Sequence, residues 1–229
     1  CGQWSSSARG TYSSFADASR ASFTSSSISL FLLSRYTDPP VVDSRREQHI
    51  FLVGVKGAGK SACGRALARR LGRPFVDLDD RIERAFARTS GRTAAVRQIY
   101  RLDDGATFRV LEAEACAEMT QEHSPAVVAT GGGLCDNDAA VSHLDHGVVV
   151  HLTAPADVLF ARVIRHGIPP FLHAASREEA WEKFADLYKH RTAQYTQLAD
   201  ISVSTGEEGV RGTVETLISR LEEHGYGRK

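Results

Sequence analysis

The chain has 229 residues, of which 28 are basic and 28 acidic, so its formal net charge is zero. This length suits one α/β domain with a substantial core plus additional sequence. A nucleic-acid partner is disfavoured because backbone binding normally needs a basic surface, and no apolar run approaches the roughly 20 residues of a membrane span.

Residues 1–46 differ in composition from the rest, with many serines, scattered arginines, few acids and no apolar period. Such a segment cannot bury a core, so we predict a disordered tail followed by a folded domain over residues 47–229. The tail could be an organelle transit segment, a native flexible tail, or sequence translated from upstream of a start near Val41 or Val42, which we favour. We expect a cytoplasmic protein, or one in a plastid or other organelle if the tail is a transit segment.

Five apolar runs alternate with helical periodicity from residue 49 onward. The expected strands are residues 49–55, 74–79, 126–130, 147–153 and 201–205. Strands that alternate with helices indicate a parallel sheet, so the predicted fold class is α/β, with a five-stranded parallel sheet flanked by helices on both faces. The segment "HGIPPFLHAAS" breaks this pattern, and its Pro-Pro pair argues against a helix there.

The stretch "GVKGAGKS", residues 54–61, fits the pattern G-x-x-x-x-G-K-[ST] between a strand and a helix. In this loop backbone N–H groups surround nucleotide phosphates, the lysine contacts the β- and γ-phosphates, and the hydroxyl binds Mg²⁺. We therefore predict a nucleotide site formed by Gly57, Ala58, Gly59, Lys60, Ser61 and Ala62. The loop does not identify the phosphate acceptor.

The second expected strand ends in "DLDD", which places Asp77 and Asp79 on the same side of the strand. Carboxylates at the C-terminal end of a parallel strand face the ligand crevice. One of them can bind Mg²⁺ while the other orients or deprotonates an incoming hydroxyl. The alternative is that they cap the following helix.

Three further motifs follow in the chain. The run "TGGG" contains Gly131, Gly132 and Gly133, which let the backbone approach a bound molecule closely, or else form a tight turn. "FRVLE" places Arg109 one helical turn from Glu112, a spacing that is usually a surface pair. "KHRTAQYTQLAD" places Arg191 and Tyr195 on one helical face.

The order and spacing of these motifs resemble those of the shikimate kinase family over residues 50–221. The motifs are the phosphate loop, D-x-D, F-R-x-x-E, A-T-G-G-G and R-x-x-x-Y-x-x-x-A-D. The resemblance implies a monomeric P-loop kinase that uses ATP and Mg²⁺. Its substrate would be shikimate, whose 3-hydroxyl is phosphorylated on the chorismate pathway to the aromatic amino acids.

The resemblance also implies a role for each matching residue. Lys60 and Ser61 would bind ATP and Mg²⁺, with Asp77 near the metal and Asp79 at the reacting hydroxyl. Arg109 and Arg191 would bind the substrate carboxylate, which suits guanidinium forks, and the three glycines would line the ring. Arg162 matches an arginine that stacks on adenine, although Arg165 competes for this role.

The chain departs from the family at the mobile lid, where Pro169 occupies the position of an arginine that reaches over the transferring phosphate. The family's G-E before F-R is also changed, to Gly105 and Ala106. Lys56, in the third position of the phosphate loop, could supply the missing catalytic charge or be merely exposed. Two alternatives stay open: a kinase of another hydroxy acid such as gluconate, and a nucleotide-binding module without turnover.

Overall fold

The computed structural model describes residues 48–165, 167–206 and 208–226, and the tail predicted for residues 1–46 lies outside them. Five strands form one sheet in the order β2-β3-β1-β4-β5, and each neighbouring pair is parallel. Their bounds are β1 (His49–Val53), β2 (Phe75–Asp77), β3 (Val127–Ala129), β4 (Gly147–Thr153) and β5 (Ile201–Ser204). The predicted fold class is confirmed.

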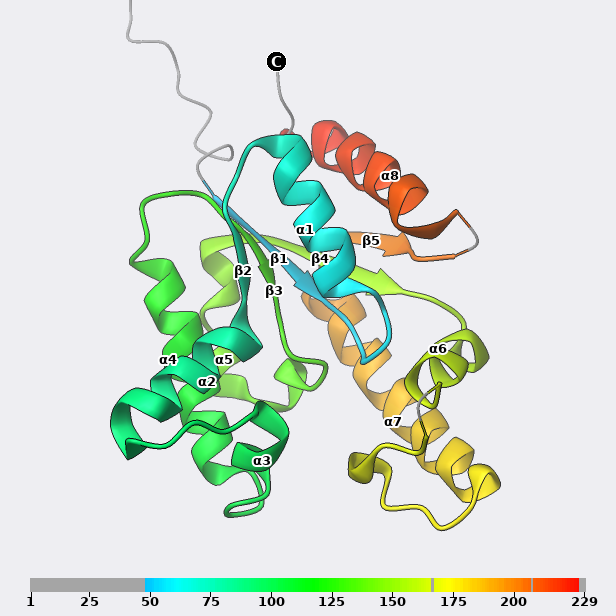
Figure 1. The fold of residues 1–229 in the computed structure, drawn as a ribbon. Coiled ribbons are helices and arrows are strands. Elements are labelled where there is room, and N and C mark those ends of the chain that lie inside the picture. The colour runs from blue at the N-terminus through cyan, green and yellow to red at the C-terminus, as the bar shows by residue number, and fades with distance from the viewer. Residues whose placement is uncertain (1–47, 166, 207, 227–229) are drawn as a thin grey trace, which may run out of the picture. The chain divides into compact units, whose positions relative to one another are not determined.

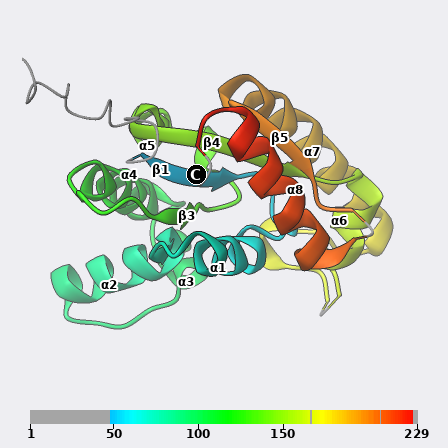
Figure 2. The same cartoon turned by 90° about the horizontal axis from the view of Figure 1, so that it is seen from above.

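The α-helices are α1 (Lys60–Leu71), α2 (Leu78–Ser90), α3 (Val96–Tyr100), α4 (Ala106–Thr120), α5 (Asp138–Val141), α6 (Ala156–Val163), α7 (Arg177–Leu198) and α8 (Gly209–Glu223). Short 3₁₀ turns are η2 (Leu134–Asp136), η3 (Leu144–His146) and η4 (Pro170–Leu172). Helices α1 and α8 cover one face of the sheet, and α7 packs on the other with α5 (Figures 1 and 2). Helices α2, α3 and α4 pack together on the β2–β3 side (Figure 1).

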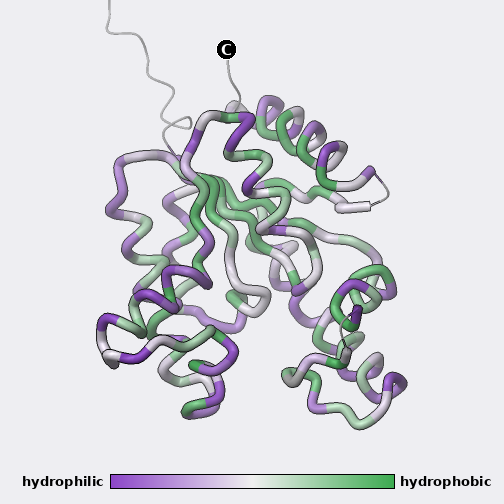
Figure 3. The backbone as a smooth tube through the Cα atoms, in the orientation of Figure 1, coloured by the Kyte–Doolittle hydropathy of each residue, from purple (hydrophilic) through white to green (hydrophobic). Residues whose placement is uncertain are grey.

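The sheet follows from the apolar pattern of its strands. All five residues of the central strand β1 are buried, as expected for a parallel strand covered on both faces. The edge strand β5 instead alternates buried and exposed residues. The strands form the apolar centre of the molecule, and polar residues are concentrated on the outer helices (Figure 3).

The second strand is shorter than predicted, and this corrects the placement of Asp79. Strand β2 ends at Asp77, which is the N-cap of α2 and accepts a hydrogen bond from the backbone N–H of Asp79 at 3.3 Å. Asp79 therefore lies in the first turn of α2 and not on the strand. An Asp side chain readily caps a helix, so it ended the strand two residues early. The Pro-Pro segment likewise forms one 3₁₀ turn, η4, where no helix was predicted.

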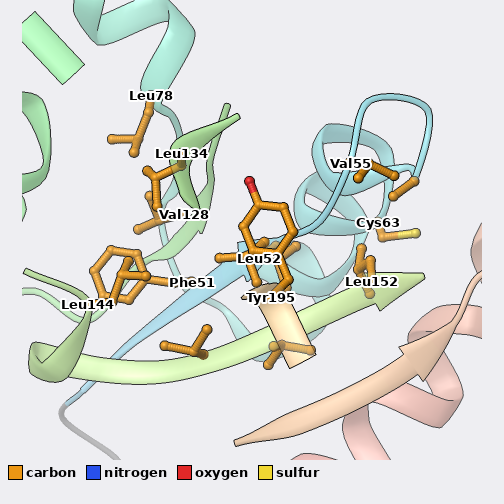
Figure 4. Close-up of a cluster of buried hydrophobic side chains, with 14 of the residues drawn as sticks. Phe51, Leu52, Val55, Cys63, Leu78, Val128, Leu134, Leu144, Leu152 and Tyr195 are labelled. Atoms are coloured by element: carbon orange, nitrogen blue, oxygen red, sulfur yellow. The ribbon is translucent and has the colours of Figure 1, made fainter. Parts of the chain in front are cut away.

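Tyr195 of α7 inserts between apolar side chains of the sheet, including Leu52 and Leu152 (Figure 4). Its ring lies against that of His151 on β4, with ring centroids 5.6 Å apart. His151 is buried, and neither of its ring nitrogens has a hydrogen-bond partner among the described residues. Burial, together with the smaller effect of the positive charge of Lys60, lowers the pKa of His151 to about 4.

The buried histidine predicts a specific loss of stability in acid. At pH 8 the residue is neutral in both the folded and unfolded chain. Below its ordinary pKa the unfolded chain binds a proton that the folded chain does not, so His151 should lower the free energy of unfolding by about 2 kcal/mol at pH 5. His151→Phe keeps an aromatic ring and cannot ionise. Urea unfolding at pH 8 and pH 5 should therefore show a smaller loss in the variant, and equal losses would contradict the assignment.

Candidate active site

The phosphate loop joins β1 to α1 and depends on glycines in the left-handed region. Gly54 has φ 137° and lies so close to β4 that a Cβ there would meet the Leu152 carbonyl oxygen at 2.3 Å. Gly57 and Gly59 have φ 90° and 87°. The loop then enters α1, whose first N–H groups have no carbonyl partner within the helix and suit an anion. The predicted nucleotide residues 57–62 thus lie in the loop between β1 and α1 and in the first turn of α1.

Lys60 is buried, and its Nζ donates to the carbonyl oxygens of Gly54 and Val55 at 2.8 and 3.2 Å. Burial lowers the pKa of Lys60 to about 8, although the carboxylates of Asp79 and Asp77 oppose this shift. Its ammonium group is therefore held beside the loop carbonyls, and a bound phosphate would raise its pKa again by direct charge pairing.

Ser61 and Asp77 form the candidate magnesium site. The Ser61 hydroxyl donates to Asp77 Oδ2 at 2.8 Å, which joins the start of α1 to the end of β2. Mg²⁺ prefers oxygen ligands and is usually held by one or two protein groups together with water and phosphate oxygens. The hydroxyl and carboxylate therefore fit the metal that the sequence predicted.

Asp79 lies half-buried in the same cluster of charges. Burial raises the pKa of its carboxyl group, the nearby Asp77 carboxylate raises it further, and Lys60 and Lys56 oppose the rise. A carboxylate that is less acidic than usual accepts a proton more readily. Asp79 thus has the chemistry of a group that orients or deprotonates a hydroxyl, even though it stands on a helix and not on the predicted strand.

The three glycines after β3 are in contact with three different parts of the site. A Cβ on Gly131 would lie 3.0 Å from Glu112 Oε1, and one on Gly132 would lie 2.9 Å from the backbone nitrogen of Lys56. At Gly133 it would meet Arg191 Nη2 at 2.8 Å. The absence of side chains here lets the phosphate loop, α4 and α7 approach one another.

Arg109 and Arg191 line one pocket, as a shared role in substrate binding requires. The other residues of this pocket are Cys135, Asp136, Asp138, Leu187, His190 and Gln194. Arg191 is held by Asp136 and by the Gly132 carbonyl oxygen. The Tyr195 hydroxyl donates to the Gly131 carbonyl oxygen at 3.4 Å, so α7 also supports the glycine loop.

Sequence reasoning misjudged Glu112 and did not select two of its neighbours. Glu112 is only 1% exposed, so the expectation of a surface pair with Arg109 was wrong. It accepts a hydrogen bond from Asn137 Nδ2 at 2.9 Å, and burial raises its pKa. Asn137 also donates to the backbone oxygen of Arg109, and Asp136 binds Arg191. Their position three and four residues after the glycine run, in the segment that follows the carboxyl end of a parallel strand, was the available signal.

Three basic residues bear on the remaining predictions. Arg162 donates to the Gly57 carbonyl oxygen at 3.3 Å and to the Thr205 carbonyl oxygen at 2.8 Å, so it joins the phosphate loop to the end of β5. Arg165 is exposed, and its backbone forms a bridge with Gly167. The Lys56 Nζ lies 5.5 Å from the centroid of the Phe171 ring, which connects the phosphate loop to η4.

These features together define a P-loop phosphotransferase. They are a parallel sheet with a phosphate loop, a hydroxyl and a carboxylate suited to Mg²⁺ beside that loop, a further carboxylate, and a pocket lined by arginines. The family model described as shikimate kinase matches residues 56–222. A shikimate kinase of Burkholderia pseudomallei (strain 1710b) is 37% identical over 188 residues, which cover 80% of this chain and 96% of the relative. The chain belongs to the shikimate kinase family.

Two further comparisons agree with this assignment. A shikimate kinase of Thermosynechococcus vestitus is 38% identical over 173 residues, covering 76% of this chain and 87% of the relative. The solved structure of the shikimate kinase from Acinetobacter baumannii in complex with shikimate matches with a TM-score of 0.68 and 29% identity. That match covers 79% of this chain and 96% of the solved one.

The lowered pKa of Lys60 predicts that nucleotide binding takes up a proton in mild alkali. Above pH 8 the free protein holds Lys60 increasingly as the neutral amine, which must be protonated to pair with phosphate. ATP affinity should therefore fall roughly tenfold per pH unit above pH 8. Calorimetry at pH 8.5 in two buffers with different ionisation heats should show net proton uptake. Affinity that stays constant from pH 7 to pH 9 would show that Lys60 keeps its proton in the free protein.

Proposed function

We propose that this chain transfers the γ-phosphoryl group of ATP to the 3-hydroxyl of shikimate. The observation that carries the proposal is the junction of two half-sites at Asp79. The charges of Lys60 and Lys56 on the phosphate loop act on this carboxylate, and a Cβ on Gly131 would lie 3.7 Å from Asp79 Oδ1. The same glycine run reaches Arg191, which shares a pocket with Arg109. Shikimate combines one carboxylate with several hydroxyls, which matches this arrangement.

The residues divide the work of phosphoryl transfer, which depends on positioning and charge neutralisation. Arg109 and Arg191 would bind the carboxylate and so fix the ring, and Gly131–Gly133 would leave room for it. Asp79 would orient the hydroxyl and accept its proton. Lys60 would pair with the β- and γ-phosphates, and Ser61 and Asp77 would hold Mg²⁺. When bound, Mg²⁺ neutralises phosphate charge.

The nucleotide base would lie near Arg162, which already reaches the phosphate loop and the end of β5. Arg165 makes no such contact in the described residues, which supports Arg162 as the adenine-stacking residue. The proposal includes a monomer, because one chain supplies every proposed site residue, and it includes a cytoplasmic location.

We assign to Lys56 the catalytic charge that the family resemblance places on the lid arginine. Lys56 opposes the rise in the pKa of Asp79 and contributes to lowering that of Lys60, so its charge acts within the reaction centre. Lys56 is itself exposed, as are Arg165, His173 and Arg177 near the prolines, so exposure does not separate the candidates. Lys56 differs in that its charge acts on Asp79 and Lys60, and His166 lies outside the described residues. The contact of Lys56 with Phe171 lets η4 cover the loop and exclude water, which strengthens the remaining electrostatic interactions.

A coupled ADP-release assay with shikimate, gluconate and other hydroxy acids tests the proposed acceptor. Turnover should require shikimate and Mg²⁺. In Arg109→Ala the KM for shikimate should rise roughly ten- to a hundredfold while the KM for ATP changes little, because one charge-assisted hydrogen bond is lost. Arg97→Ala, an exposed position on α3, is the matched control. Preference for another hydroxy acid, or an unchanged KM for shikimate in Arg109→Ala, would overturn the assignment of the acceptor.

The role of Lys56 has its own test. Lys56→Met should lower kcat about a hundredfold and leave ATP binding nearly intact, since a preorganised charge at the transition state contributes about 3 kcal/mol. Adding Pro169→Arg to this variant should restore part of the rate. Lys189→Met removes an exposed lysine of α7 and serves as the control. Full activity in Lys56→Met would return the role to the basic residues around the prolines.

A further inference from the structure

Arg191 is held on three sides by groups of the loop that follows β3. Its Nε and Nη2 donate to Asp136 Oδ2 at 3.0 and 2.7 Å, and its Nη1 donates to the Gly132 carbonyl oxygen at 3.1 Å. The Cα of Gly133 faces the guanidinium group so closely that a Cβ would meet Nη2, Cζ and Nη1 within 3.2 Å. The orientation of the guanidinium plane is therefore fixed by this loop and not by α7 alone.

The hydrogen bonds of Arg191 show how many of its N–H groups remain for a ligand. A guanidinium has five N–H groups in a rigid plane, and the contacts to Asp136 and Gly132 use three of them. Asp136 takes the edge formed by Nε and Nη2. One N–H on Nη1 and one on Nη2 remain, and a guanidinium uses such groups to donate charge-assisted hydrogen bonds to a carboxylate.

We infer that Asp136 is a positioning residue, which orients Arg191 so that its remaining N–H groups can bind a substrate carboxylate in the pocket shared with Arg109. The inference rests on the proposed function, since it needs a substrate with a carboxylate. It concerns a residue outside the motifs by which the chain resembles its family. Asp136 stands three residues after the glycine run, at the end of η2, so it couples the loop that lines the ring to the arginine that binds the carboxylate.

A competing effect of Asp136 has the opposite sign. Its negative charge partly neutralises Arg191 and would repel a substrate carboxylate. The side chains of Asp136 and Arg191 are 22% and 20% exposed, so water screens part of this repulsion. The hydrogen bonds, by contrast, fix a long and flexible side chain before the substrate arrives, which lowers the ordering cost of binding. We therefore expect positioning to outweigh repulsion.

Two variants of Asp136 separate these effects in steady-state kinetics. Asp136→Asn keeps an oxygen acceptor for Arg191 but removes the charge, so the KM for shikimate should stay within about twofold of wild type. Asp136→Ala removes the acceptor as well, and the KM for shikimate should rise roughly tenfold, with little change in kcat or in the KM for ATP. If both variants lower the KM, the role of Asp136 is repulsion and positioning is refuted. A KM that is unchanged in Asp136→Ala also refutes it.

A double-mutant cycle tests whether Asp136 acts through Arg191. Adding Asp136→Ala to Arg191→Ala should cause no further rise in the KM for shikimate, because the group that Asp136 positions is gone. A further rise of the same size would show direct action or general damage to the loop, and would overturn the inference. Wild-type turnover of shikimate is measured first. Failure of the proposed function would appear there, and failure of the inference only in the variants.

Discussion

The close approach of Gly132 to the backbone of Lys56 is the contact on which the arrangement of the site depends. It brings the loop that follows β3 against the loop that follows β1, at a distance where a Cβ would lie 2.9 Å from the Lys56 nitrogen. Strands β1 and β3 are parallel neighbours, with Leu52 paired to Ala129, so their loops leave the same edge of the sheet side by side. The nucleotide side and the acceptor side of the site can therefore meet without a domain interface.

This proximity also concentrates charge of both signs in a small, partly buried volume. Lys60, Lys56, Asp77 and Asp79 all change the protonation equilibria of their neighbours, and burial shifts Lys60 and Asp79 toward their neutral forms. Lys60, with a pKa of about 8, is thereby close to exchanging its proton under ordinary conditions, and Asp79 holds a proton more readily than an ordinary aspartate. An arriving phosphate and an arriving hydroxyl would each find a partner whose charge state responds to binding, which is the physical basis for transfer between them.

The sequence predicted those features that depend on strong local signals. The five apolar runs predicted the sheet, and the phosphate loop predicted which edge of it faces a nucleotide. Few other structures are compatible with short apolar runs that alternate with helices or with a glycine-rich turn between a strand and a helix. The D-x-D motif was harder, since it fitted both a strand end and a helix cap. Asp77 accepts a hydrogen bond from the Asp79 backbone N–H and caps the helix, which places Asp79 in the helix. Periodicity gives no sign of such a choice at the boundary of a strand.

Contacts between distant segments were beyond sequence reasoning. Glu112 looked like a surface residue because its partner Asn137 is 25 positions away in the sequence. The role of Asp136 could be inferred only from the fold, because its partner Arg191 lies on α7. The lid showed the same limit. Its prolines signalled a departure from the family, whereas the contact between Lys56 and Phe171 required the folded chain.

We propose that Arg109 and Arg191 select the acceptor of this kinase by binding the carboxylate of the substrate. The most direct test of this proposal compares kcat/KM for shikimate with that for the carboxamide of shikimate, which keeps every hydroxyl and removes only the negative charge. We predict a preference for shikimate of roughly ten- to more than a hundredfold, the value of one or more charge-assisted hydrogen bonds. Equal values of kcat/KM for the two compounds would contradict the account.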